Sequence, residues 1–326
     1  MTDENKKNSI DKVASAAGVS IATVSRFLNG QLDRMSEKTA KRIQNIIDEM
    51  NYVPNAAARQ LMTKTSKMIA VVVANIEDYF SSEIFKGIDG IAITEGYTPV
   101  LFDTNGDEQQ ELYLIDKINQ QNFDALIIQP LNVDANMIKK HLKRNIPVIT
   151  VDRLLENSEW PTVVSDNYDV TKNVSNYYLS KGYTHAVIVT EPIGTVSTRR
   201  DRAAAIKSVY PDASLVEVNA KDNVAKKVKA RIFADVDKKE KILIFALKER
   251  LVLKLAARFR QDFTNANIKL TGFAESDVLF EINPGLKLVR QNPFKMGVTT
   301  GELILSLLNS DEASVPAVTV VKADYL

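Results

Sequence analysis

The first thirty residues place two short helices on either side of a single glycine. Gly18 predicts the end of the first helix, because glycine adopts the left-handed conformation of a helix C-terminus at little steric cost. Ser20 is a typical N-cap for the second helix, which we expect over residues 21–28. Two short helices joined by a tight glycine turn predict a helix-turn-helix. Apolar residues recur at helical spacing in the first helix: Ile10, Val13, Ala14 and Ala17.

The second helix has side chains that suit contact with DNA. Ala22 and Thr23 are small, so the start of this helix can enter a major groove. Arg26 can then reach a phosphate or the edge of a guanine. A third helix, capped by Ser36 and running to about residue 50, would close the small core with one apolar face.

The motif resembles the lactose/galactose-repressor (LacI/GalR) family. Residues 13–30 read Val-Ala-x-x-Ala-Gly-Val-Ser-x-x-Thr-Val-Ser-Arg-x-Leu-Asn-Gly, and Val-Pro-Asn at 53–55 and Ala-Arg-x-Leu at 58–61 follow. The resemblance implies a helix-turn-helix headpiece over 1–54 and a hinge helix with a linker over 55–67. Residues 68–326 would then form a periplasmic-binding-protein-like effector domain.

The resemblance also implies the residues that contact DNA. Ile21, Ala22 and Arg26 match positions facing the groove, and the first two can read bases only by apolar contact. Ser20 and Ser25 have an alternative role as helix caps alone. Seven residues match phosphate-contacting positions: Ser9, Ser20, Thr23, Ser25, Asn29, Tyr52 and Asn55.

Residues 55–62 predict a short alanine-rich helix that is marginal in water by itself. In the family this hinge helix orders when two subunits meet on DNA. Leu61 matches the apolar wedge inserted into the minor groove, and Ala58 lies on the same segment. The alternative is a linker helix packed on the rest of the chain.

Composition favours a DNA-binding protein of the cytoplasm over an enzyme. The net charge is only +1, yet residues 1–64 carry ten Lys and Arg against seven Asp and Glu, a modestly basic headpiece. The chain has no cysteine, two histidines outside any metal-spaced motif, and no glycine-rich phosphate loop, so we expect no metal and no cofactor. There is no leader-like start and no apolar run long enough for a membrane.

From residue 68 onward, apolar strands alternate with helices, which predicts parallel α/β sheets. Eight strands fit two open sheets, and the resemblance implies two subdomains joined by three crossovers near Ser165, Arg290 and Val318. The N-subdomain would comprise about 68–165 and 290–318, and the C-subdomain about 166–289 and 319–326. We expect strands over 68–74, 98–103, 125–129, 147–151, 185–190, 214–218, 241–245 and 269–273. Helical stretches lie between most of them, such as 81–94, 107–120, 168–181, 199–209 and 249–259.

An effector cleft is expected between the subdomains, at the carboxyl ends of the strands. Arg202 is the strongest candidate contact, because a guanidinium binds carboxylates or paired hydroxyls with two parallel hydrogen bonds. Phe80 could stack on a ligand or pack in the core. The candidate effector residues are Asn75, Tyr79, Phe80, Asp152, Arg153, Arg199, Arg202, Ala274 and Gln291.

Three departures from the family pattern bear on the effector. Ala274 replaces the aspartate that anchors sugars, Leu247-Lys248 replaces an Asn-Asp pair, and Asn219-Ala220 replaces an aromatic residue. The arginines that remain suggest an anionic effector, such as a sugar acid or sugar phosphate, as in regulators of the 2-keto-3-deoxygluconate type.

The sequence therefore predicts a homodimeric repressor of carbohydrate-metabolism genes that reads a pseudo-palindromic operator. Alternatives are a regulator controlled by a partner protein, one without an effector, and a solute-binding receptor.

Overall fold

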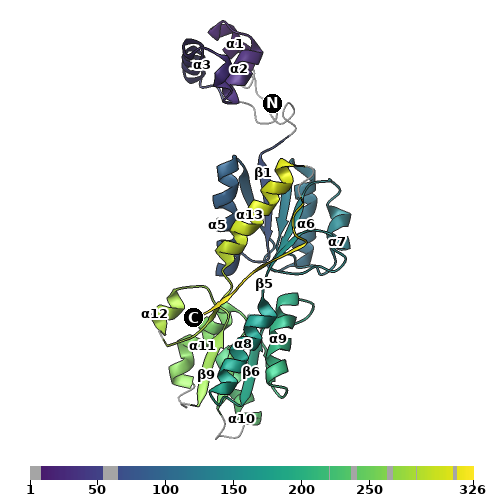
Figure 1. Ribbon diagram of the computed structural model, residues 1–326, viewed down its shortest axis with the longest axis vertical. Coiled ribbons are helices and arrows are strands. Elements are labelled where there is room, and N and C mark those ends of the chain that lie inside the picture. The colour runs from purple at the N-terminus through teal and green to yellow at the C-terminus, as the bar shows by residue number, and fades with distance from the viewer. Residues whose placement is uncertain are drawn as a thin grey trace. The chain divides into compact units, whose positions relative to one another are not determined.

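The computed structural model describes residues 9–53, 65–219, 221–235, 241–262, 267–283, 285–310 and 314–326, which divide into two compact units. The first unit, Met1–Ser66, contains the predicted headpiece, and the second, Lys67–Leu326, corresponds to the predicted effector domain (Figure 1). The proposed hinge residues Asn55, Ala58 and Leu61 lie outside the described residues. No helix in the described ranges is long and apolar enough to cross a membrane.

The headpiece contains the three expected helices, α1 (Ile10–Ala17), α2 (Ile21–Leu28) and α3 (Glu37–Glu49), with a 3-10 turn at Leu32–Arg34. Gly18 ends α1 with φ 62° and ψ 39°, as predicted. Ser20 caps α2 by accepting the Thr23 backbone N–H at 3.2 Å. Ser36 caps α3 in the same way. The helices pack around a core of Val13, Ala14, Ala17, Val24, Ile43 and Tyr52.

The N-subdomain is a parallel sheet covered on both faces by helices. Its strands are β1 (Met68–Val73), β2 (Thr98–Asp103), β3 (Ala125–Ile128), β4 (Val148–Val151), β5 (Thr162–Ser165) and β11 (Val318–Val321), in the order β11-β5-β4-β3-β1-β2. One face packs on α5 (Tyr79–Ala92) and α13 (Pro293–Asn309). The other packs on α6 (Glu108–Gln120) and α7 (Ala135–His141) (Figure 1).

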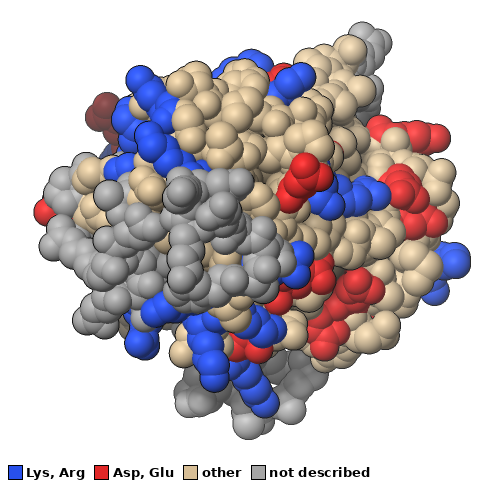
Figure 2. All heavy atoms as spheres, turned by 90° about the horizontal axis from the view of Figure 1, so that it is seen from below, with Lys and Arg blue, Asp and Glu red and all other residues tan. Residues whose placement is uncertain are grey.

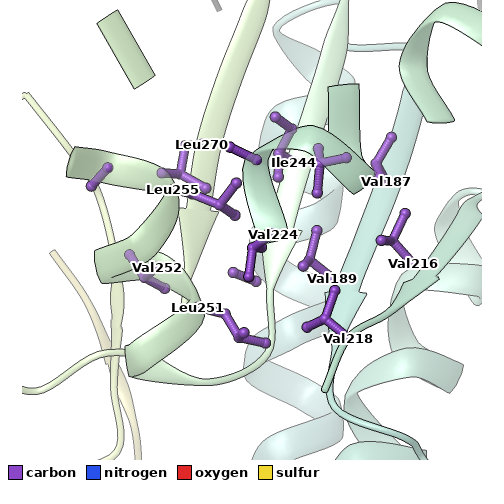
Figure 3. Packing of buried hydrophobic residues seen from close by; sticks show 14 of the residues in the cluster. Val187, Val189, Val216, Val218, Val224, Ile244, Leu251, Val252, Leu255 and Leu270 are labelled. Carbon is purple, nitrogen blue, oxygen red and sulfur yellow. The ribbon is translucent and has the colours of Figure 1, made fainter. Parts of the chain in front are cut away.

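The C-subdomain repeats this architecture with strands β6 (His185–Thr190), β7 (Ser214–Glu217), β8 (Ile242–Ala246) and β9 (Ile268–Gly272), in the order β7-β6-β8-β9. Helices α8 (Asn167–Ser180) and α9 (Ser197–Val209) cover one face. Helices α10 (Val224–Asp235), α11 (Glu249–Asp262) and α12 (Val278–Ile282) lie on the other side. Figure 3 shows the hydrophobic core on this side of the C-subdomain sheet, which includes valines of β6 and β7 and leucines of α11.

Three chain segments connect the subdomains. The first lies between β5 and α8, and the second between β10 (Val289–Arg290) and α13, near the positions expected. The third was expected near Val318, but Val318–Val321 pairs with β5 and so belongs to the N-subdomain sheet. The chain therefore crosses at 322–323, before β12 (Asp324–Tyr325) pairs with β10. The expected third boundary, near Val318, was therefore wrong, because the edge strand β11 precedes the crossover.

Helices α5 and α13 approach closely enough for their backbones to touch. A Cβ atom built on Gly87 would lie 2.2 Å from the Phe294 backbone oxygen and 2.7 Å from the Val298 nitrogen. A Cβ atom on Gly297 would lie 2.1 Å from the Ile84 backbone oxygen. Only glycine fits at Gly87 and Gly297, so this pair allows the backbones of α5 and α13 to come into contact.

The far end of the C-subdomain carries both signs of charge. Figure 2 views the molecule from the end at which α10 lies in Figure 1, and blue basic side chains there stand beside red acidic ones. α10 itself contributes Lys226, Lys227, Lys229 and Arg231. A mixed surface of this kind differs from the single-sign field that concentrates a polyanion.

Candidate functional site

The exposed face of α2 presents the predicted groove-reading residues. Ile21 is 47% exposed, unusual for a large aliphatic side chain on an eight-residue helix, and Ala22 and Arg26 are also exposed. Val24, on the opposite side, is fully buried in the headpiece core. The helix therefore uses one face for packing and leaves the other free for contact with bases.

The predicted phosphate contacts are distributed unevenly. The hydroxyls of Ser20 and Thr23 hydrogen-bond to each other at 2.9 Å. Residues at the capped start of α2 are thus the same ones that we expect to contact phosphate. Ser9 and Ser25 are half-buried and Asn29 is exposed at the end of α2. Tyr52 is only 8% exposed, and its ring belongs to the headpiece core.

A cavity in the effector domain lies where strands of both sheets end. Its lining includes residues that follow β1, β3 and β4 of the N-subdomain and β8 and β9 of the C-subdomain. Asn75 lines an adjoining cavity that shares Asp78, Arg153 and Arg199 with the first. The other eight candidate effector residues all line the first cavity: Tyr79, Phe80, Asp152, Arg153, Arg199, Arg202, Ala274 and Gln291.

Arg202 is fixed in place at the wall of this cavity, with only 7% of its surface exposed. Its Nε donates to Asn167 Oδ1 at 2.7 Å, and its Nη1 donates to the Leu247 backbone oxygen at 2.7 Å. Its guanidinium carbon lies 3.6 Å from the centre of the Phe273 ring. Burial lowers the pKa of Arg202 to about 10, so the side chain stays charged at neutral pH.

The other two predicted arginines have protein partners. Arg199 pairs with the Glu191 carboxylate. Arg153 donates through Nη1 to the Pro130 backbone oxygen at 3.0 Å, and its Nε lies 3.7 Å from Asp152 Oδ2. Arg202 differs from them in that its described hydrogen bonds and ring contact involve only neutral groups, while the carboxylates of Asp152 and Glu275 act on it electrostatically and favour its charged form.

Asp152 is presented to the cavity by a left-handed backbone. Its φ is 72°, a conformation that costs free energy for a residue other than glycine. Gln129 Nε2 donates to Asp152 Oδ2 at 2.9 Å, while Gln129 Oε1 accepts from the Ala74 backbone at 3.0 Å. This chain of bonds fixes a carboxylate in the cleft that can accept hydroxyl hydrogens from a ligand.

Two half-buried glutamates complete the C-subdomain side, and the sequence reasoning did not identify them. Glu249 accepts the backbone N–H groups of Glu275 and Ser276, both at 3.1 Å. Glu275 accepts the backbone N–H of Gln291, at the second crossover. Their signal in the sequence is weak, because a lone glutamate after a strand or at a helix start is usually solvated.

The lining as a whole is balanced in charge, which the arginines considered alone did not indicate. The cations are Arg153, Arg199, Arg202, Lys248 and Arg250, and the carboxylates are Glu77, Asp78, Asp152, Glu249 and Glu275. An arrangement of this kind can hold an anionic group at one place and hydroxyl groups at another.

Glu275 makes the stability of the effector domain depend on pH. Burial, with a smaller contribution from Glu249, raises the pKa of Glu275 to about 7. A carboxyl whose pKa is raised in the folded state stabilises that state fully below its unfolded pKa, and this contribution is lost as pH rises through 7. We expect the free energy of unfolding to fall by on the order of 2 kcal/mol between pH 4.5 and pH 7.5 from this group.

Urea unfolding of wild type and Glu275→Gln across that pH range measures the effect. The variant keeps an acceptor for the Gln291 N–H, so its slope should be shallower. It should not be flat, because burial also raises the pKa of Glu111 and of Glu249. Identical slopes in the two proteins would contradict the assignment.

Comparison with known proteins identifies the family. Residues 9–55 match the model of bacterial regulatory proteins of the lacI family, and residues 69–274 match that of a periplasmic binding protein domain. The chain is 31% identical to the HTH-type transcriptional regulator KdgR of Bacillus subtilis (strain 168), over 94% of this chain and 92% of that protein.

Solved structures agree. A LacI transcriptional regulator from Lactobacillus brevis superposes with a TM-score of 0.74 at 33% identity, over 79% of this chain and 99% of that one. The lac repressor dimer bound to operator and an anti-inducer shares the fold, with a TM-score of 0.83 at 20% identity over 98% and 97% of the two chains. The chain therefore belongs to the LacI family and is a DNA-binding transcriptional regulator with an effector-binding domain, not an enzyme.

Proposed function

We propose that this regulator is a homodimeric repressor of carbohydrate-metabolism genes. We also propose that an anionic sugar derivative bound in the cleft controls its affinity for a pseudo-palindromic operator. The observation that carries the effector class is Arg202. It is a buried cation that donates to a side-chain amide and a backbone carbonyl and lies over an aromatic ring, and the attraction of the Asp152 and Glu275 carboxylates does not outweigh the cost of its burial. An anion in the cleft would supply further negative charge beside it.

The rest of the cleft supports a sugar as the body of the ligand. Asp152 and Gln129 offer oriented polar groups for hydroxyls. Tyr79 and Phe80 add aromatic surface that can cover the C–H face of a sugar ring. A sugar acid, which has both a carboxylate and hydroxyl groups, uses the two kinds of contact at once.

The relatives support a dimer on DNA with a carbohydrate effector. The lac repressor structure is a dimer bound to operator, and the structure of the regulator CelR is a complex with cellobiose. A two-fold dimer places two headpieces on two half-sites, so the operator repeats its sequence about a dyad. Asn55, Ala58 and Leu61 are proposed to act there as the hinge contact with the minor groove.

A thermal-shift comparison of matched ligands tests the effector class. D-gluconate, D-glucuronate and D-galacturonate, together with sugar phosphates, are compared with glucose and galactose at equal concentration and ionic strength. We expect an acid or phosphate to raise the unfolding temperature and its neutral parent to leave it unchanged. A neutral sugar that stabilises as well as its acid would contradict an anionic effector.

The headpiece proposal predicts the effect of Arg26→Ala on DNA binding. If Arg26 bonds to a base edge, the affinity for operator should fall by about 1–3 kcal/mol, since the two hydrogen bonds of a guanidinium with guanine are lost. Mobility shifts with the promoter of the protein's own gene, and with a scrambled duplex, measure this. Arg42→Ala on α3, also exposed, is the matched control.

The scrambled duplex separates two roles for Arg26. A base contact weakens operator binding alone, whereas a phosphate contact weakens both duplexes and reduces the salt dependence of binding. Unchanged curves for Arg26→Ala on both duplexes would remove Arg26 from the DNA-binding surface.

A further inference from the structure

Lys248 lines both adjoining cavities of the cleft and contacts both subdomains. It sits between β8 and α11 in the C-subdomain, and its Nζ lies 2.8 Å from Oδ2 of Asp78, which precedes α5 in the N-subdomain. The same Nζ lies 3.4 Å from both carboxylate oxygens of Glu191, at the end of β6. A single ammonium group thus joins a carboxylate of each subdomain.

Glu191 fixes the C-subdomain end of this connection. Arg250 Nη2 lies 2.7 Å from Glu191 Oε1, and Arg199 contacts the other oxygen. Burial disfavours the ionised form of Glu191, but Lys248, Arg199 and Arg250 together outweigh burial and lower the pKa of this carboxyl. Lys248 therefore projects from a charged cluster that is held in place by several bonds, which reduces the entropy lost when it reaches Asp78.

The surroundings favour a measurable interaction between Lys248 and Asp78. Their side chains are 28% and 24% exposed, so water screens the pair less than it screens a surface ion pair. Both residues line each of the two adjoining cavities, so their contact lies between these two parts of the cleft. A second bond crosses between the subdomains, because the Leu154 backbone N–H donates to Ser197 Oγ at 3.1 Å.

We propose that the Lys248–Asp78 pair is an ionic strap that holds the two subdomains in the arrangement of this structure, which we call closed because the pair joins them across the cleft. Closure then depends on side chains of the chain itself, and the strength of the strap sets the ratio of closed to open molecules that any effector must shift. This inference concerns closure only and does not depend on the chemical class of the effector.

The distance between the subdomains tests the strap directly. The chain has no cysteine, so Gln110→Cys on α6 and Lys207→Cys on α9, both exposed, give two unique sites for spin labels. Pulsed electron–electron double resonance on the full chain measures the distance between the two labels. Doubly labelled protein is mixed with an excess of unlabelled protein, so that a dimer carries one labelled subunit.

Three variants and one control are compared. Lys248→Met and Asp78→Asn each remove one charge at nearly constant size, and the double variant removes both. The control is Lys86→Met, which breaks the Lys86–Glu83 ion pair within α5, a pair that lies inside one subdomain.

We expect each single variant to raise the open-to-closed ratio by about fivefold, the upper range for an incompletely buried ion pair. The double variant should match the single ones, because all three lose the same pair. Raising NaCl from 0.05 to 0.5 M should open the wild type but not the variants. A Lys248→Met distribution equal to that of wild type and Lys86→Met, or additive effects in the double variant, would overturn the proposal.

Discussion

Arg202→Ala is expected to abolish the response to a sugar acid and to leave operator affinity without ligand unchanged. The substitution removes the cation of the cleft whose described hydrogen bonds are all with neutral groups, so the ligand carboxylate would lose its proposed charge partner. Arg199 and Arg153 remain paired with Glu191 and Asp152. Loss of one partner from a buried, charge-assisted contact costs on the order of 2–5 kcal/mol, which removes binding at ordinary ligand concentrations. The reading helix belongs to the other compact unit and keeps its contacts with DNA.

Two further variants separate ligand binding from folding. Arg202→Met keeps an apolar stem against Phe273 and removes the charge, and Arg202→Lys keeps the charge without the planar pair of donors. Arg200→Ala, an exposed neighbour on the same helix, is the matched control. Mobility shifts with and without the stabilising acid give the result. If Arg202→Met still releases operator at the wild-type ligand concentration, Arg202 is a structural residue of the cavity wall and not a ligand contact.

The headpiece could be predicted almost completely from the sequence, because its signals are local. Gly18, Ser20 and Ser36 each determine a helix boundary through their own backbone or hydroxyl chemistry, and all three act as expected. The eight expected strands are also present. The central ones, such as β1, β3 and β8, are continuous apolar runs that are buried almost throughout.

The missed strands lack that signal. β5 has four residues and follows a proline, and β11 is an edge strand whose Val318 and Val320 are half exposed. Neither can be told from a loop without its partners: β5 lies between β4 and β11, and β11 pairs with β5, more than 150 residues earlier in the chain. The misplaced third crossover has this same cause.

A cleft residue could be predicted where the chemistry of its side chain alone indicates its role. It could not be predicted where its role depends on a partner that is distant in the sequence. Arg202 and Asp152 follow recognisable segments and do line the cavity. Lys248 was visible only as a departure from the family pattern. Its contact with Asp78 brings together positions 170 residues apart and cannot be inferred from spacing.

The helix α13 (Pro293–Asn309) is not among the helices expected from the sequence, and its composition explains why. Gly297, Gly301 and the adjacent Val298, Thr299 and Thr300 all have lower helix propensity than alanine, so the segment does not resemble a helix. In the structure, Gly297 lets α13 rest against α5 at Gly87, and the packing outweighs the propensity. Gly297, which weakens the helical signal in the sequence, is therefore also the residue that allows α13 to pack against α5.

Gly87→Ala should therefore lower the free energy of unfolding of the effector domain by about 3 kcal/mol, at the upper end of the usual cost of overpacking. The added methyl would meet the Phe294 oxygen at 2.2 Å and the Val298 nitrogen at 2.7 Å. Both are backbone atoms, so relief requires the two helices to separate and leave voids along their whole contact. Urea unfolding followed by circular dichroism measures the loss.

Gly90→Ala on the same helix is the matched control. Gly90 is exposed, and a Cβ atom there would meet nothing within 4 Å. Alanine should stabilise that position by about 0.5–1 kcal/mol, because it loses less backbone entropy on folding than glycine. The two variants carry the same chemical change three residues apart and should move stability in opposite directions. Equal midpoints would mean that α5 and α13 do not touch at Gly87, and that the N-subdomain packs in another way.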